Sequence, residues 1–338
     1  EKNFKPVKNL YAKLGTKKPN FCFAGHLDVV PPGNVKDWTI NPFMPSIKKG
    51  HLIGRGANDM KSSIASFISA VSKFLIKNKN FNGSISLLIT GDEEGDAVNG
   101  TKKVVEYLKK KREKINFCLV GEPTNPDKLG EMIKIGRRGS LTGKLKIFGL
   151  QGHVAYPHRA INPSTIIVKI LKELKEIRFD KGTKDFQPTN LEVTKINMSN
   201  KADNVIPAMA EATFNIRFNN KHSSNSIKKK LKRIFSKISK KNKSKYKIEY
   251  KVSGEAFLTK PNKTTFMIQN IIKKVTNIKP KLSTTGGTSD LRFIRKISPG
   301  LEFGLVGKTM HKVDEAVSLK DLTNLTKIYQ NILQNYFK

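Results

Sequence analysis

The amino-acid sequence predicts a mixed α/β fold in which a larger, discontinuous domain is interrupted by a smaller inserted one. Three observations support this prediction. The chain has 338 residues, more than the roughly 100 to 200 that one ordinary domain contains. Its first third alternates short apolar runs with segments of helical periodicity. Its middle third has a different order of strands and helices, after which the first rhythm returns.

In the first third, short apolar runs are separated by helical segments. The first predicted helix has apolar residues at the i, i+3, i+4 and i+7 spacing of one buried face: Ile64, Phe67, Ile68, Val71 and Leu75. The predicted strands cover residues 20–24, 84–90 and 117–121, and the predicted helices cover 61–76 and 101–111. Strands that alternate with helices in this way predict α/β layering.

The middle third is predicted to follow the order β-α-β-β-α-β. Its elements are a strand at 140–148, a helix at 163–177, strands at 190–196 and 210–218, a helix at 224–239 and a strand at 245–252. In the strand at 210–218, apolar and polar residues alternate, which is typical of a sheet with one covered face. This order is that of a ferredoxin-like domain, and we assign residues 140–252 to it.

After Gly254 the alternation of strands and helices seen in the first third returns. We predict a helix at 264–275, a strand at 301–305 and a final helix from about 319 to 336, which Ser318 and Asp321 could begin as a capping box. The larger domain is therefore expected to comprise residues 1–139 and 253–338.

The net charge of +37 is the most extreme feature of the composition, with 64 Lys and Arg against 27 Asp and Glu. Such a charge is compatible with a nucleic-acid or membrane partner. Lysine greatly outnumbers arginine, however, and the basic runs at 228–230 and 240–241 lie on a predicted helix without interleaved aromatic residues. We interpret the charge as compositional bias, with nucleic-acid binding as the alternative. A cationic surface could also steer an anionic substrate.

The sequence predicts a cytoplasmic location. It contains no run of about 18 apolar residues, and its first ten residues lack the apolar segment of a signal peptide. The two cysteines, Cys22 and Cys118, each lie in an apolar strand-like run, which is typical of buried thiols in a reducing compartment. We expect neither a disulfide nor a membrane partner.

Acidic residues are scarce, so clusters of carboxylates and histidines near the ends of predicted strands stand out. Five such clusters occur: residues 25–28, 58–61, 92–95, 121–124 and 310–312. In open α/β sheets, ligands bind beyond the carboxyl ends of the strands, so these turns could converge in space. Two isolated histidines, His51 and His222, are interpreted as packing or surface residues.

Imidazole and carboxylate groups together are typical ligands of borderline divalent metals, zinc in particular. With a bridging carboxylate they could hold two ions about 3.5 to 4 Å apart, which would activate a water for attack on a carbonyl. The neighbours Glu93 and Glu94 could then divide two roles, one as a ligand and the other as a general base. Asp28, two residues after His26, could accept the other imidazole N–H and fix its tautomer.

These clusters also carry a family resemblance. Residues 25–31, 54–61, 92–94 and 121–123 read Gly-His-Leu-Asp-Val-Val-Pro, Gly-Arg-Gly-Ala-Asn-Asp-Met-Lys, Asp-Glu-Glu and Gly-Glu-Pro. In these motifs and their order, the sequence resembles the dinuclear-zinc aminoacylase and carboxypeptidase family over nearly the whole chain. The resemblance implies a zinc-peptidase-like catalytic domain that holds two Zn²⁺ per subunit, which Co²⁺ could replace.

The resemblance assigns roles to individual residues. It implies that His26 and Glu122 bind one zinc ion, that Glu94 and His311 bind the other, that Asp59 bridges them, and that Glu93 is the general base.

Four further motifs, at 136–143, 151–158, 204–207 and 286–290, resemble one subgroup of the family, whose members remove an N-acyl group from an anionic amino-acid substrate. Arginine forks suit its carboxylates. The implied substrate contacts are Arg137, Arg138, Tyr156, Asn204, Arg217, Gly287, Thr288 and Ser289. His153 is implied as a donor to the oxyanion, from the neighbouring subunit of a homodimer built through the inserted lid domain.

Two alternatives stay open: an N-acyl deacylase with another acyl specificity, and a nonenzymatic basic binding protein on the same scaffold. The sequence also departs from the family pattern in two places. The family has a further helix and strand region ahead of the strand that ends at His26, so we expect an N-terminally truncated chain. Ser62 stands where the family usually has Gly, and the turn after Asp59 is expected to survive this change.

Overall fold

The computed structural model describes residues 4, 6–198, 200 and 202–338, and the chain divides into two compact units. The larger unit comprises residues 1–136, 259–283 and 289–338, and the smaller one comprises 137–258 together with 284–288. The short segment 284–288 is a difference from the sequence prediction, which had placed it in the larger domain.

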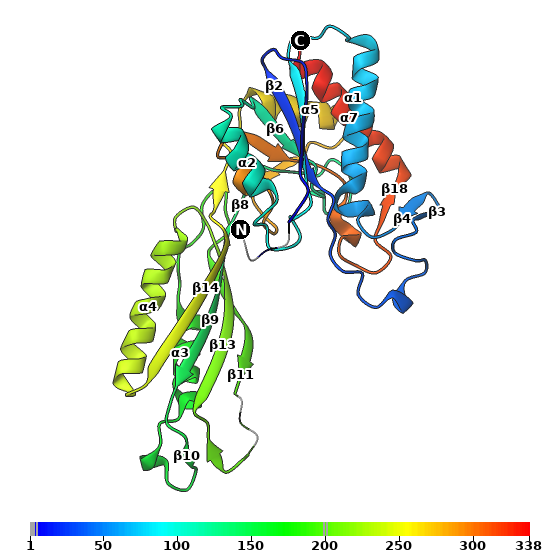
Figure 1. The fold of residues 1–338 in the computed structure, drawn as a ribbon. Coiled ribbons are helices and arrows are strands. Elements are labelled where there is room, and N and C mark those ends of the chain that lie inside the picture. Colours follow the sequence, from blue (N-terminus) through cyan, green and yellow to red (C-terminus); the bar gives the residue numbers. More distant parts are fainter. Residues whose placement is uncertain (1–3, 5, 199, 201) are drawn as a thin grey trace. The chain divides into compact units, whose positions relative to one another are not determined.

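A seven-stranded sheet of order β1-β5-β2-β6-β17-β7-β16 forms the centre of the larger unit (Figure 1). Its strands are β1 (Leu10–Leu14), β2 (Asn20–His26), β5 (Ser84–Thr90), β6 (Phe117–Val120), β7 (Met132–Lys134), β16 (Lys281–Ser283) and β17 (Gly300–Glu302). Strand β2 is parallel to both β5 and β6, and β17 is parallel to β6. The carboxyl ends of β2, β5 and β6 therefore meet at one edge of the sheet.

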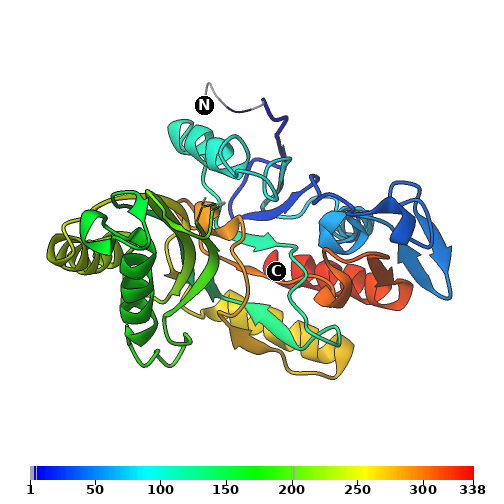
Figure 2. The same ribbon diagram turned by 90° about the horizontal axis from the view of Figure 1, so that it is seen from below.

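Helices cover this sheet, with α2 on one side and α5 and α7 on the other in Figure 2. The helices of the unit are α1 (Ser62–Lys77), α2 (Thr101–Lys110), α5 (Lys263–Thr276), the short α6 (Leu291–Ile294) and α7 (Leu319–Tyr336). Helix α1 packs along α7, so segments from both ends of the chain share one core. There the rings of Phe23 and Phe67 stack at 4.4 Å, and the hydroxyl of Tyr329 donates to the carbonyl of Phe303 at 2.7 Å.

A second, three-stranded sheet of order β18-β4-β3 lies in the same unit. It consists of β3 (Ser46–Lys48), β4 (His51–Ile53) and β18 (Ala316–Ser318). Because β4 precedes the turn η2 (Ala57–Lys61) and β18 follows His311, pairing of these strands links two segments that carry candidate ligands. Two further short helical turns are η1 (Val35–Asp37) and η4 (Gly307–Thr309).

The smaller unit contains a four-stranded antiparallel sheet of order β11-β13-β9-β14. In chain order its main elements are β9 (Gly139–Phe148), α3 (Pro163–Glu176), β11 (Asn190–Asn197), β13 (Met209–Phe218), α4 (Ser224–Lys241) and β14 (Lys245–Gly254). The alternate residues Phe214, Ile216 and Phe218 of β13 are buried in one core with residues of α3 and α4, so both helices cover one face of the sheet; the helix residues include Ile167, Ile170, Leu231 and Phe235. The unit also has the short strands β10 (Gly152–His153) and β12 (Val205–Ile206) and the turn η3 (Pro157–Arg159).

The six predicted elements of the middle segment all occur in the predicted order, and the helices predicted at 61–76, 101–111 and 264–275 are confirmed. Ser318 caps α7 by accepting the backbone N–H of Asp321 at 3.3 Å. The short strands β8 (Gly136–Arg137) and β15 (Phe257–Leu258) complete the structure. Within the described residues, no helix combines the length and the apolar composition needed to cross a membrane.

Candidate metal centre

Five strand ends and turns of the larger unit carry the residues that the sequence singled out as metal ligands. His26 is the last residue of β2, Glu93 and Glu94 follow β5, and Glu122 follows β6. Asp59 lies in the turn η2, and His311 lies between η4 and β18. The parallel strands bring these distant parts of the sequence to one edge of the sheet, as expected for a ligand site in an α/β fold.

The carboxylate of Asp59 lies between two imidazoles. Its Oδ1 is 3.2 Å from Nε2 of His26, and its Oδ2 is 3.2 Å from Nε2 of His311. Each oxygen of one carboxylate therefore faces a different histidine. This is the arrangement of a group that can bridge two cations.

A second carboxylate accompanies each histidine. Oε1 of Glu94 lies 2.8 Å from Nε2 of His311, and Oε1 of Glu122 lies 3.9 Å from Nε2 of His26. Donor atoms of His26, Asp59 and Glu94 all lie within 4.8 Å of one another. The side chains thus form two groups of one imidazole and one carboxylate, joined at Asp59.

The ring of His26 is oriented by its other nitrogen. Nδ1 lies 3.0 Å from the backbone carbonyl of Asp28 and 3.7 Å from that residue's Oδ1. The carbonyl can only accept, so Nδ1 carries a proton. Nε2 faces Asp59 and donates to its carboxylate, and loss of that proton would leave the Nε2 lone pair free for a cation at the cluster. The carboxylate of Asp28 instead accepts the backbone N–H of Glu94 through Oδ2 at 2.9 Å, which ties the turn after β2 to the turn after β5.

The charges of the cluster are strongly coupled. Burial opposes ionisation of Asp59, but hydrogen bonds from His26 and His311 outweigh it and lower the pKa of Asp59 to about 2. The hydrogen bond to Asp59 and the charge of Glu94 raise the pKa of His311 to about 9. Burial also opposes protonation of His26, yet Asp59 and Glu122 together raise the pKa of its imidazole well above the usual value.

Carboxylates are in excess at this centre. Burial, reinforced by the charge of Asp59, raises the pKa of Glu94 and raises that of Glu122 well above the usual value. Carboxylates gathered in a buried place need compensating positive charge. Oxygen and imidazole donors at these positions fit divalent cations of the zinc type, and such cations would supply that charge.

The loop that carries Glu93 and Glu94 is shaped by Asp92. Its carboxylate accepts the backbone N–H groups of Ala97, Val98 and Asn99 at 3.2, 2.8 and 2.8 Å. The loop is therefore fixed by its own first residue. The sequence motif Asp-Glu-Glu thus combines one structural carboxylate with two that face the centre.

Glu93 differs from the other carboxylates because its nearest charged partner is an arginine. Its Oε1 lies 3.4 Å from Nη1 of Arg292, and its side chain is buried. Burial, together with the negative charge of Asp290, raises the pKa of Glu93 to about 8. Sequence reasoning missed both Asp290 and Arg292, although Asp290 ends the motif at 286–290.

The candidate substrate residues of the smaller unit form two groups. His153, Tyr156 and Asn204 lie together around the pairing of β10 with β12: the rings of His153 and Tyr156 are 5.8 Å apart, and the carbonyl of Asn204 accepts the N–H of Val154 at 3.1 Å. His153 and Tyr156 are exposed, with Nδ1 of His153 accepting the N–H of Ala155 at 3.1 Å.

The second group contains the three arginines. Arg137 donates to the carbonyl of Thr285 at 3.2 Å, within the segment that includes Gly287 and Thr288. Arg138 donates to Asn190, and Nε of Arg217 on β13 donates to Asn215 at 3.0 Å. Burial lowers the pKa of Arg217. Ser289, by contrast, belongs to the larger unit, where it is fully buried and its hydroxyl donates to Glu302.

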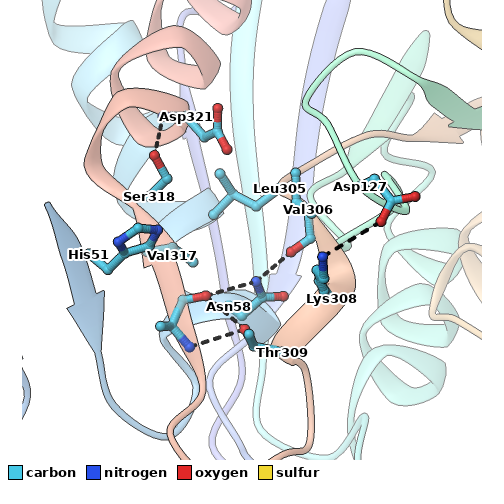
Figure 3. A pocket seen from close by; sticks show the side chains of 11 residues that line it. His51, Asn58, Asp127, Leu305, Val306, Lys308, Thr309, Val317, Ser318 and Asp321 are labelled. Atoms are coloured by element: carbon cyan, nitrogen blue, oxygen red, sulfur yellow. Dashed lines mark hydrogen bonds and ion pairs between the residues drawn. The ribbon is translucent and has the colours of Figure 1, made fainter. Parts of the chain in front are cut away.

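A pocket of about 200 Å³ opens beside Asn58, the residue before Asp59 (Figure 3). It is lined by residues of β4, η2, η4 and the start of α7, including His51, Thr309, Ser318 and Asp321. The candidate ligands are not among the residues that line it. The centre described above therefore does not coincide with this pocket.

Imidazole and carboxylate side chains gathered at the strand ends of an α/β sheet fit the class of metal-dependent hydrolases. The chain belongs to peptidase family M20/M25/M40, whose sequence pattern matches residues 22–335.

Curated relatives match over nearly the whole chain. This chain is 76% identical to a succinyl-diaminopimelate desuccinylase of Pelagibacter ubique, and the match covers 100% of this chain and 88% of the relative. It is 50% identical to a protein of the same name from Parvibaculum lavamentivorans, over 98% of this chain and 83% of the relative.

Solved structures share the fold at lower identity. A metallo-carboxypeptidase from Sulfolobus solfataricus is 18% identical with a TM-score of 0.78, covering 98% of this chain and 89% of that one. A dinuclear metal binding peptidase from Bacillus subtilis is 14% identical with a TM-score of 0.71, covering 97% and 85%.

Proposed function

We propose that this chain hydrolyses the amide bond of N-succinyl-LL-diaminopimelate and releases succinate and LL-diaminopimelate, in the synthesis of lysine and of cell-wall precursors. The observation that carries the chemistry is the carboxylate of Asp59 between two imidazoles, each 3.2 Å away. The choice of substrate is supported by the 76% identity to a desuccinylase over the full chain.

In this proposal two metal ions occupy the centre. His26 and Glu122 would hold one ion, Glu94 and His311 the other, and Asp59 both. Imidazole and carboxylate donors favour Zn²⁺, and Co²⁺ accepts a similar donor set and could replace it. When bound, the ions polarise the amide carbonyl and lower the pKa of the attacking water.

Glu93 is proposed as the general base. It takes a proton from the attacking water and passes it to the amide nitrogen as the C–N bond breaks, which leaves a carboxylic acid and an amine. Burial and the negative charge of Asp290 raise the pKa of Glu93, which favours proton uptake by this carboxylate over proton uptake by an exposed one. Arg292, 3.4 Å away, holds the carboxylate in place.

The smaller unit is proposed to be a ferredoxin-like lid and dimerisation domain that binds the substrate. The substrate has three carboxylates and one ammonium group, and guanidinium forks bind carboxylates at two points. We propose Arg137, Arg138 and Arg217 for this task, with backbone and hydroxyl groups of Gly287, Thr288 and Ser289 beside the reacting end. Because the hydroxyl of Ser289 already donates to Glu302, only its backbone is available.

Attack on the amide places negative charge on the carbonyl oxygen, and His153 is proposed to donate a hydrogen bond to this oxygen in addition to the metal ions. His153, with Tyr156 and Asn204 beside it, would come from the neighbouring subunit of a homodimer. We also place the reaction in the cytoplasm, since both cysteines are buried free thiols of the kind that a reducing compartment maintains.

A side-by-side assay tests the proposed substrate. Purified protein loaded with Zn²⁺ should hydrolyse succinyl-diaminopimelate with a kcat/KM at least about tenfold above that for acetylornithine. A preference for acetylornithine would make the chain an acetylornithine deacetylase or a related deacylase. Salt-dependent nucleic-acid binding without hydrolysis would instead favour a nonenzymatic basic protein.

A further inference from the structure

The side chain of Glu315 is completely buried four residues after His311. Its Oε2 lies 2.6 Å from Nη1 of Arg55, and each of the two side chains is only 1% exposed. The guanidinium of Arg55 also lies 5.1 Å from the ring of Trp38. Desolvation offsets much of the attraction within such a buried ion pair, so the pair itself contributes little net stability.

The carboxylate of Glu315 also accepts three backbone N–H groups from the turn that carries Asp59. Oε2 accepts that of Gly56 at 3.1 Å, and Oε1 accepts those of Asn58 and Asp59 at 2.8 and 3.0 Å. Asp59 has φ −117° and ψ 94°, which is not helical, so its N–H depends on a partner outside the turn. Glu315 is that partner.

Further hydrogen bonds join the same two segments. The side-chain amide of Asn58 donates to the carbonyls of Val306 and Ala316 at 2.6 and 3.3 Å, and the N–H of Gly54 donates to the carbonyl of Glu315 at 2.8 Å. The hydroxyl of Thr309 exchanges hydrogen bonds with both backbone groups of Ala316, at 2.8 and 3.1 Å (Figure 3).

The bonds between Thr309 and Ala316 close the segment 309–316 into a loop that contains His311. The bond from the Asp59 N–H to Glu315 fixes this loop to the backbone of Asp59. These hydrogen bonds therefore fix the distance between the carboxylate of Asp59 and the imidazole of His311. The groups that make the bonds do not contact either imidazole. Such outer groups set the orientation of metal ligands.

We propose that Glu315 is a positioning residue for the metal centre: by receiving the N–H groups of Asn58 and Asp59 from the segment that carries His311, it sets the distance between the bridging carboxylate and the second histidine. The proposal rests on the proposed two-metal function. It predicts that loss of the Glu315 charge weakens metal binding in a protein that is still folded.

Glu315→Gln tests this, because the amide keeps the size and an acceptor oxygen but loses the charge that pairs with Arg55. We expect about 10- to 100-fold weaker Zn²⁺ binding to the metal-free protein, measured by competition with a chelator. The absorption spectrum of the Co²⁺-loaded variant should also change, since it reports ligand geometry. For the assayed substrate, kcat should fall more than KM rises.

Asp180→Asn is a matched control, because Asp180 in the smaller unit is a buried carboxylate that likewise accepts backbone N–H groups, from Gly182 at 2.6 Å and Thr189 at 3.3 Å. This variant should unfold at a lower temperature than the wild type and bind Zn²⁺ with unchanged affinity. A purely structural role for Glu315 would give the same result as the control.

Two further variants keep the test decisive if Glu315→Gln does not fold. Glu315→Asp retains the charge but shortens the reach, and Arg55→Met combined with Glu315→Gln leaves no unpaired charge in the core. Glu315→Asp should therefore lose less Zn²⁺ affinity than Glu315→Gln. Wild-type Zn²⁺ affinity in a folded Glu315→Gln protein or in the folded double variant would overturn the proposal. A wild-type protein that binds no Zn²⁺ would instead overturn the proposed function.

Discussion

At the scale of single residues, the molecule is organised around carboxylates that have different tasks within a few residues of one another. Asp92 fixes a loop through three backbone N–H groups, Glu93 faces an arginine, and Glu94 faces His311. Similar side chains are therefore distinguished by their partners rather than by their chemistry. Substitutions at neighbouring positions should give qualitatively different defects.

Glu93→Gln should retain both metal ions and lose most turnover. The amide cannot accept the proton, and a general base contributes about 10²- to 10⁴-fold to the rate. Zinc content of the purified variant and kcat are the two measurements. Glu94→Gln is the paired control and should lose zinc. If the Glu93 variant lost its zinc while it remained folded, the roles of the two glutamates would have to be exchanged.

Arg217→Ala should raise KM for the succinylated substrate strongly and leave zinc stoichiometry unchanged, because a half-buried guanidinium that pairs with a carboxylate contributes about 2 kcal/mol to binding. Arg217→Lys should recover only part of the loss, since an ammonium lacks the fork. Arg233→Ala removes an exposed arginine of α4 and controls for the change in net charge. An unchanged KM would remove Arg217 from the substrate site.

The candidate ligands could be predicted because acidic residues are rare in this sequence and those near strand ends stand out. Arg292, Arg55 and Glu315 could not be predicted in the same way. Glu93 and Arg292 are separated by 199 positions, and Arg55 and Glu315 by 260. Only the folded chain brings such pairs together, and neither lysine-rich composition nor local periodicity indicates which of many charges will be buried.

At the scale of elements, long periodic helices and buried strands were predictable, and most short strands were not. Strands β3, β4, β7, β16 and β18 have three residues each, too few for an alternating pattern to be recognised. The equally short β17 was predicted, although the predicted range of 301–305 extends beyond its end at Glu302. Strand β1 is half exposed at the edge of its sheet, and its pairing with β5 depends on a partner more than 70 residues away. The terminal helix α7 was predicted together with its N-cap residue Ser318; of the predicted capping box, the structure shows the bond from the Asp321 N–H to the Ser318 hydroxyl.

Ser318→Ala should lower the free energy of unfolding by about 1 kcal/mol, because the N–H of Asp321 loses its acceptor at the start of α7. Denaturant unfolding of the metal-free protein measures the change. Thr323→Ala, one turn further along the exposed face of α7, is the control and should have little effect. Equal stability of the two variants would show that the cap contributes nothing.

At the scale of the whole molecule, a continuous middle segment forms most of one unit, and the flanking segments together form the other. The change of rhythm in the sequence indicated this division. That residues 284–288 pack with the smaller unit was not predictable, because this packing depends on contacts such as the hydrogen bond from Arg137 to Thr285. The proposed contribution of His153 to the site of the neighbouring subunit also belongs to this scale.

His153→Ala and Glu93→Ala proteins, each nearly inactive alone, should regain activity when they are mixed and exchange subunits. Random exchange makes about half of the molecules mixed dimers with one complete site each, so about a quarter of wild-type activity is expected. Native mass spectrometry confirms that mixed dimers have formed. Their presence without activity would mean that His153 acts within its own chain or has no part in the reaction.

The packing of α1 along α7 has a consequence for synthesis on the ribosome. His311 is made 217 residues after Glu94, a delay of about 10 to 40 s at typical rates of translation. Throughout that interval β2 and α1 exist without Tyr329 and the rest of α7, and their aromatic side chains have no complete core to enter. The continuous segment 137–258 of the smaller unit is synthesised before the larger unit is complete and can fold first. The core of the larger unit thus stays incomplete while the smaller unit can already fold, and the candidate metal ligands come together only after the last part of the chain has been made.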